Sequence, residues 1–70
     1  MNVIALCDKD TASGLRLAGI QTVYVPTEEK TALQYWHEIE DQIESIGLII
    51  VTEEIAEEIG KELNEFRLRN

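Results

Sequence analysis

Basic residues, prolines and long apolar runs are scarce in this 70-residue sequence. Six lysines and arginines stand against fourteen acidic residues, which gives a formal net charge of −8. Nucleic acids and anionic membrane surfaces both attract basic faces, so the charge argues against both classes of partner. The longest apolar run, Ile46–Val51, is far too short to cross a bilayer.

Cysteine is also scarce, because Cys7 is the only one, and no internal disulfide can form. A single thiol fits a reducing compartment. The N-terminal residues lack the basic segment and cleavage site of a signal peptide. Together these features predict a cytoplasmic protein.

Three short apolar segments are predicted to form strands: Val3–Cys7, Thr22–Val25 and Leu48–Val51. The first and third show no alternation of apolar and polar residues. Continuous apolar strands are typical of parallel sheets that are covered on both faces.

Helices are predicted after each strand. The first covers Thr11–Ala18, with Asp8 or Asp10 as its cap and Gly19 as its stop. Thr27 is the predicted cap of the second and Thr52 of the third. The apolar stripe of the second helix comprises Ala32, Trp36, Ile39, Ile43 and Ile46, and that of the third comprises Ile55, Ile59, Leu63 and Phe66.

The element order is therefore β-α-β-α-β-α in a single α/β domain covering residues 1–70. Connections of this length make neighbouring strands parallel, and right-handed crossovers limit the topologies. The simplest arrangement is a small three-stranded sheet in the order 2-1-3, with helices on both faces.

Acidic residues follow the first and third strands, where sites form in open α/β sheets: Asp8, Asp10, Glu53 and Glu54. Such a cluster could bind Mg²⁺, as in a receiver-like signalling domain, which is the alternative function. A receiver needs an aspartate at the end of its third strand, where this chain has Val51-Thr52. Capping of helices explains the acids more simply.

No glycine-rich phosphate loop follows the first strand, so no nucleotide site is predicted. His37 has no metal-ligand partner at a suitable spacing and is expected on the surface. Cys7 is expected to be a small core residue. Gly14, inside a helix, is expected to let that helix approach the sheet closely. We therefore predict no catalytic residue, cofactor or metal site.

Two segments resemble the F subunit of archaeal/vacuolar-type rotary ATPases. The first is Asp10-Thr11-Ala12-Ser13-Gly14-Leu15-Arg16-Leu17-Ala18-Gly19-Ile20, and the second is Gly47-Leu48-Ile49-Ile50-Val51-Thr52-Glu53-Glu54-Ile55-Ala56. The motif residues are the candidate interaction residues: Asp10, Thr11, Gly14, Arg16, Leu17, Ala18, Gly19, Thr52 and Glu53.

This resemblance implies a non-catalytic rotor component of the central stalk, which couples ATP synthesis or hydrolysis to ion transport. It implies contacts with the D subunit of the stalk and with the A/B catalytic hexamer, on the cytoplasmic face of the membrane. It also implies that this chain is C-terminally truncated, because the family continues into a fourth strand and a C-terminal helix.

The third strand is expected to lie at an edge of the sheet, and its sequence Leu48–Val51 has no charge or proline to discourage pairing. We therefore expect the chain to self-associate as a dimer. The two copies could pair their third strands or exchange their third helices.

Overall fold

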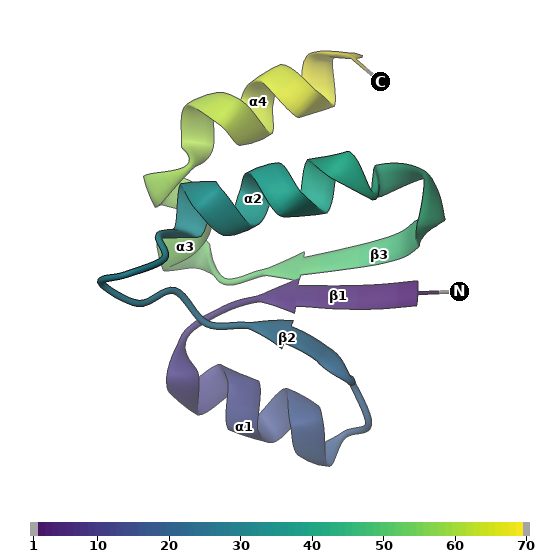
Figure 1. Cartoon of the computed structure of the whole chain (residues 1–70), viewed down its shortest axis with the longest axis vertical. Helices are drawn as coiled ribbons and strands as arrows, with labels where there is room; N and C mark the ends of the chain where they lie inside the picture. The colour runs from purple at the N-terminus through teal and green to yellow at the C-terminus, as the bar shows by residue number, and fades with distance from the viewer. Residues whose placement is uncertain (1, 70) are drawn as a thin grey trace.

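A three-stranded parallel sheet forms the centre of the fold in the computed structural model, which describes residues 2–69 and the side chains of residues 2–66 (Figure 1). The strands are β1 (Asn2–Leu6), β2 (Thr22–Tyr24) and β3 (Ile46–Val51). Their order is β2-β1-β3, and β1 pairs in parallel with both neighbours. The predicted α/β class and strand order are confirmed.

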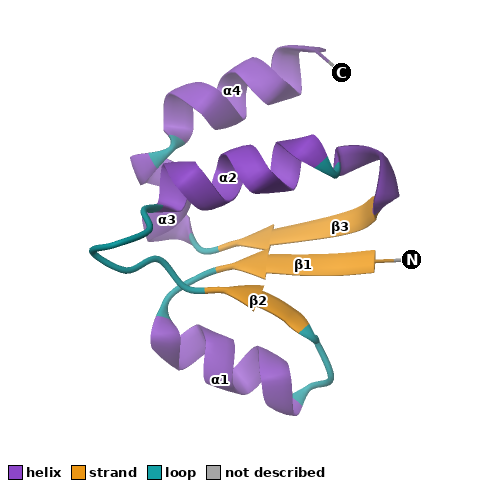
Figure 2. Ribbon diagram, viewed as in Figure 1, coloured by secondary structure: helices purple, strands orange, loops and turns teal. Residues whose placement is uncertain are grey.

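Helices cover both faces of the sheet. The helix α1 (Lys9–Leu17) lies on one side, and α2 (Ala32–Asp41) and α4 (Gly60–Arg69) lie on the other (Figure 2). The short α3 (Glu53–Glu58) leads from β3 into α4. Because β1 is covered on both faces, its residues from Ile4 onward are fully buried, as its unbroken apolar sequence predicts.

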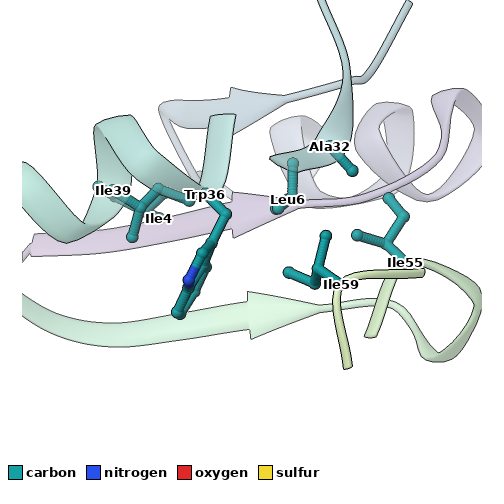
Figure 3. Close-up of a cluster of buried hydrophobic side chains, with 7 residues drawn as sticks. All are labelled: Ile4, Leu6, Ala32, Trp36, Ile39, Ile55 and Ile59. Carbon is teal, nitrogen blue, oxygen red and sulfur yellow. The ribbon is translucent and has the colours of Figure 1, made fainter. Parts of the chain in front are cut away.

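The larger part of the core lies between the sheet and α2, α3 and their flanks. Apolar side chains of β1 and the predicted helical stripes meet there (Figure 3). Leu63 and Phe66 of α4 pack against this cluster while partly exposed. The buried members are Ile4, Leu6, Ala32, Trp36, Ile39, Ile55 and Ile59.

The opposite face has a smaller core under α1. Its fully buried members, Ala5, Cys7 and Ala12, are all small, so the helix backbone lies close to the sheet. Burial raises the pKa of the Cys7 thiol, in keeping with its predicted role as a core residue. The expectation that Gly14 provides the close approach is wrong: Gly14 is exposed, and a Cβ there would meet no atom within 4 Å. Ala12 occupies the packed position instead.

Gly14 therefore costs helix stability without relieving a clash. It has no positive φ and lies in the middle of α1. We expect Gly14→Ala to stabilise the protein by about 0.5–1 kcal/mol, because alanine loses less backbone entropy on folding. Urea denaturation followed by circular dichroism checks this, and a lower midpoint would contradict the open surroundings of Gly14.

The C-terminus of α1 is closed by two backbone hydrogen bonds around Gly19. The Gly19 N–H donates to the Arg16 carbonyl at 3.1 Å, and the Ile20 N–H donates to the Leu15 carbonyl at 3.0 Å. Gly19 has a φ of 99°, and Leu15 and Ile20 both pack against the smaller core. This is a Schellman ending, which needs a residue with positive φ. The predicted stop at Gly19 is confirmed.

Gly19→Ala should destabilise the protein by about 1–2 kcal/mol, because a Cβ is strained at positive φ. The same urea titration used for Gly14→Ala provides the measurement. The two substitutions are chemically identical, one inside α1 and one just past its end, so their opposite signs separate backbone strain from helix propensity. Equal midpoints for the two variants would contradict this assignment.

The prediction that Thr27 caps the second helix is wrong. Thr27 closes a local turn instead, since its Oγ1 accepts from the Lys30 N–H at 3.1 Å. The helix begins four residues later with a capping box. Thr31 Oγ1 accepts from the Gln34 N–H at 3.2 Å, and Gln34 Oε1 accepts from the Thr31 N–H at 2.8 Å. Lysine at the third position cannot close such a box, whereas glutamine can.

A surface contact holds the β2–α2 loop against α2. Lys30 Nζ lies 2.7 Å from Glu38 Oε1 and 4.6 Å from the centre of the Tyr35 ring. The hydrogen bond to Glu38 raises the pKa of Lys30. Tyr35 in turn stacks on Tyr24 at 4.9 Å, which ties the end of β2 to α2.

The predicted stripe residues all pack in the larger core, but the helices predicted to carry them are shorter or interrupted. α2 ends at Asp41, Ile43 lies in a short 3₁₀ turn (Ile43–Ser45), and Ile46 already belongs to β3. The third predicted helix is interrupted at Ile59 and continues from Gly60 as α4. Glycine is a poor helix former, which explains why the interruption falls here.

Candidate partner-binding surface

The carboxyl ends of the three strands lie side by side at one edge of the sheet. The Cys7 N–H donates to the Tyr24 carbonyl at 3.0 Å, and the Thr52 N–H donates to the Leu6 carbonyl at 3.3 Å. Asp8 and Glu53, which follow these strand ends, are exposed. This is the edge where sites form in open α/β sheets.

Asp8 is the N-terminal cap of α1. Its Oδ2 accepts from the Thr11 N–H at 3.2 Å, and its Oδ1 accepts from the Thr11 hydroxyl. These bonds to the Thr11 hydroxyl and amide hold the pKa of Asp8 below its ordinary value. Asp10 is exposed in the first helical turn, where its negative charge interacts favourably with the positive end of the helix dipole. Asp8 and Thr11 thus have a structural role.

Asp8→Ala should lower the urea midpoint at pH 7, and the difference from the parent protein should vanish in acid. The folded pKa lies below the unfolded value of about 3.9. The stabilisation is therefore present above that value and is lost as the pH falls through the folded pKa. Asp8→Asn is the matched control, since asparagine caps helices without titrating. A pH-independent deficit in Asp8→Ala would contradict this account.

The acidic cluster of the receiver-like alternative does not form. Among the described residues, no group of three or more histidine, cysteine, aspartate or glutamate side chains is placed to hold a metal ion. Thr52 stands where a receiver would carry its aspartate, and its Oγ1 is buried without a hydrogen-bond partner. His37 is on the surface, as predicted, with Nδ1 3.7 Å from Glu40 Oε1.

Four residues of the first motif lie on the outer face of α1 and at its C-cap. Gly14, Arg16, Leu17 and Ala18 are all exposed, and Leu17 is 91% exposed. Exposing a leucine this fully gains nothing for folding. Packing therefore explains Thr11, Ala12 and Gly19 but not these four residues. We call Gly14, Arg16, Leu17 and Ala18 the α1 surface.

The second motif forms β3 and the start of α3. Thr52 occupies the N-cap position, and its carbonyl accepts from the Ala56 N–H at 2.8 Å, but its side chain makes no capping bond. Thr52 is therefore at the predicted N-cap position of this helix, but its side chain does not cap the helix. Ile55 is buried and Glu53 is exposed in the first turn of α3. Most of this motif serves the fold.

Sequence reasoning did not predict an apolar groove beside β3. Its volume is about 310 Å³. The Trp36 ring contacts Phe66 edge-on at 5.6 Å between centroids, and Trp36 Nε1 is buried without a hydrogen-bond partner. The only available signal was that Leu63 and Phe66 continue the apolar stripe beyond Gly60. The groove is lined by Trp36, Ile49, Val51, Ala56, Leu63 and Phe66.

The match to a known family covers nearly the whole chain. Residues 3–70 match the family model described as ATP synthase (F/14-kDa) subunit. The chain belongs to this family. The resemblance carried by the two motifs is therefore confirmed, and the α1 surface and the β3 groove are features of a member of this family.

Curated relatives from archaea support the assignment. The F subunit of the A-type ATP synthase of Methanocaldococcus jannaschii is 40% identical over 63 residues, which are 90% of this chain and 63% of that protein. The F subunit of Methanococcus aeolicus is 34% identical over 67 residues, or 96% of this chain and 67% of that protein. The F subunit of Thermococcus onnurineus is 36% identical over an alignment of 64 residues, and the match covers 86% of this chain and 62% of that protein.

The chain thus spans a little under two thirds of the length of most of these relatives. No solved structure gives a significant match. In the part of the chain that the structure describes, no helix is both long and apolar enough to span a membrane.

Proposed function

We propose that this chain acts as a non-catalytic central-stalk component of an A-type ATP synthase, bound to the D subunit beneath the A/B catalytic hexamer. Its place is then peripheral, on the cytoplasmic face of the membrane. Membership of the ATP synthase (F/14-kDa) family is the observation that carries this proposal. The capping role of Asp8 supports it, because the carboxylate nearest the end of β1 is engaged in structure.

The α1 surface is the contact to the D subunit in this proposal. Arg16 and Leu17 lie in adjacent positions on an exposed helix, and neither stabilises the fold by packing. A leucine beside an arginine suits a helical partner, because the leucine gains burial while the guanidinium can pair with a carboxylate at the rim. The stalk partner covers Leu17 and removes its exposed area from water.

Binding of the chain to the immobilised D subunit tests the proposal directly. We expect measurable binding that Leu17→Lys weakens by about tenfold or more, as expected for a buried apolar contact. Leu48→Lys is the matched control, because Leu48 is an exposed leucine on β3 rather than on α1, and the charge change is the same.

The outcomes separate the two parts of the proposal. Absence of binding by the parent chain would contradict the role as a partner of the D subunit. If Leu17→Lys bound the D subunit as tightly as the parent chain, the role as a partner of the D subunit would still hold, but the contact would lie outside α1. Micromolar binding of Mg-ATP in calorimetry would contradict a stalk component without a nucleotide site.

A further inference from the structure

Gly14 is a residue that the fold does not explain. It lies in the middle of α1, is exposed and has no positive φ. A Cβ at this position would meet no atom within 4 Å, so no close approach inside the described part of the chain calls for a glycine. Glycine is the poorest helix former apart from proline, so its presence weakens α1. Any use of the missing side chain must therefore lie on the outer side of the helix.

The outer face of α1 is centred on Leu17. Residues three and four positions apart lie on the same face of a helix, so Leu17 is flanked one turn earlier by Ser13 and Gly14. The buried Ala12 lies on the opposite side, against the sheet. Leu17 is 91% exposed, and both residues that flank it are exposed and small. A prominent apolar side chain thus stands next to a turn of almost bare backbone.

The exposure of this face does not depend on what adjoins the edges of the sheet. Helix α1 lies on one side of the sheet, and α2 and α4 lie on the other (Figure 2). A further strand paired at either edge would lie in the plane of the sheet, whereas the outer face of α1 points away from that plane. The exposure of Leu17 is therefore a property of α1 itself.

Arg16 adds a positive charge beside this face. It is exposed, and among the residues that the structure describes it forms no ion pair, whereas Lys30 is paired with Glu38. The chain as a whole is acidic, with a formal net charge of −8. A carboxylate of a partner would therefore be attracted to Arg16 and repelled by most other surfaces of the chain.

We propose that Gly14 determines the affinity of the contact between α1 and the D subunit, an inference that rests on the proposed function. The backbone of the D subunit comes closest to α1 at Ser13 and Gly14. Leu17 packs against the side of the approaching element, and Arg16 pairs with one of its carboxylates. A helix fits this surface, because the side chains at the crossing point set the distance between two packed helices, and here they are small.

Gly14 in this arrangement lowers the stability of the free chain and raises its affinity for the partner. A methyl group at this position has open space in the free chain and favours the helix. In the complex, the same methyl group overpacks the point of closest approach. Stability and affinity should therefore change in opposite directions in Gly14→Ala. A residue with a structural role alone would change both in the same direction.

Two measurements on Gly14→Ala test the proposal: binding to the immobilised D subunit and a urea titration. We expect the urea midpoint to rise and the binding to weaken by about tenfold or more. Gly60→Ala is the matched control, because Gly60 begins α4 and a Cβ there also meets no atom within 4 Å. This variant should bind the D subunit as tightly as the parent chain.

A charge variant tests the ion pair of Arg16. Arg16→Gln keeps a polar side chain and removes the charge. We expect it to weaken binding by about threefold or more at about 0.05 M salt and by less at about 0.5 M, because salt screens the pair that the variant lacks. An affinity that fell by the same factor at both salt concentrations would contradict the ion pair.

The outcomes distinguish this inference from the proposed function. If the parent chain did not bind the D subunit, both would be wrong. If Leu17→Lys weakened binding but Gly14→Ala bound as tightly as the parent chain, the contact through α1 would hold and the role of Gly14 would be wrong. Equal weakening by Gly14→Ala and Gly60→Ala would also overturn the inference, because binding would then depend on helix stability rather than on close approach at Gly14.

Discussion

Replacing Trp36 by alanine should leave the chain largely unfolded at room temperature. Trp36 is 1% exposed at the centre of the larger core, between α2, β3 and α4. Truncating a buried tryptophan to alanine costs about 3–5 kcal/mol. A domain of this size gains only about 3–5 kcal/mol from its core, so the loss equals the whole stability. Far-ultraviolet circular dichroism and a urea titration measure the effect.

Trp36→Phe is the informative control. It keeps an aromatic ring against Phe66, which contacts the tryptophan edge-on, and it removes an indole N–H that has no partner. A buried donor without an acceptor is costly, so its removal offsets part of the lost volume. We expect a change within about 1.5 kcal/mol. If Trp36→Ala unfolded cooperatively at the same urea midpoint as the parent protein, α4 would have moved into the space that the indole ring leaves empty.

Side-chain periodicity alone predicted most of the fold. The apolar runs around Ile4 and Ile49 identified β1 and β3, and the three-and-four spacing of Ala32, Trp36 and Ile39 identified the buried face of α2. The handedness of the crossovers limited the topologies, and the simplest doubly wound arrangement among them has the observed strand order. These features depend on which side chains leave water, and that information is local in the sequence.

The boundaries that were missed depend on competition between local signals. Thr27 and Thr31 are both suitable caps, and the choice depends on the third residue after each, Lys30 or Gln34. The interruption at Ile59, next to Gly60, results from weak helix propensity inside an unbroken apolar stripe. An apolar stripe shows where burial occurs but not where the backbone changes direction.

The candidate site was predicted only as a set of motif residues. The sequence pattern did not separate Thr11 and Gly19, which have structural roles, from Arg16 and Leu17, which lie on the surface. That separation requires the rotation of α1 about its axis. Ala12 sets this rotation, because it is the α1 residue that is fully buried.

Ala12→Leu should destabilise the chain by about 1–3 kcal/mol, because a larger side chain overpacks the interface between α1 and the sheet. Ala12 is 0% exposed and packs with Ala5 and Cys7, which are also 0% exposed. No flexible long side chain is fully buried in this cluster, so α1 itself must move away from β1. A urea titration and the hydrogen exchange of α1 amides measure the change.

Gly14→Leu is the matched control on the same helix, two residues away. Its side chain meets open space, and leucine is a better helix former than glycine. We expect it to raise the urea midpoint, with a gain of up to about 1 kcal/mol. Destabilisation by Gly14→Leu together with tolerance of Ala12→Leu would mean that α1 is rotated relative to the arrangement described. In that case Leu17 would no longer be the outermost residue of the helix, and the proposed contact with the D subunit would have to be moved to another face.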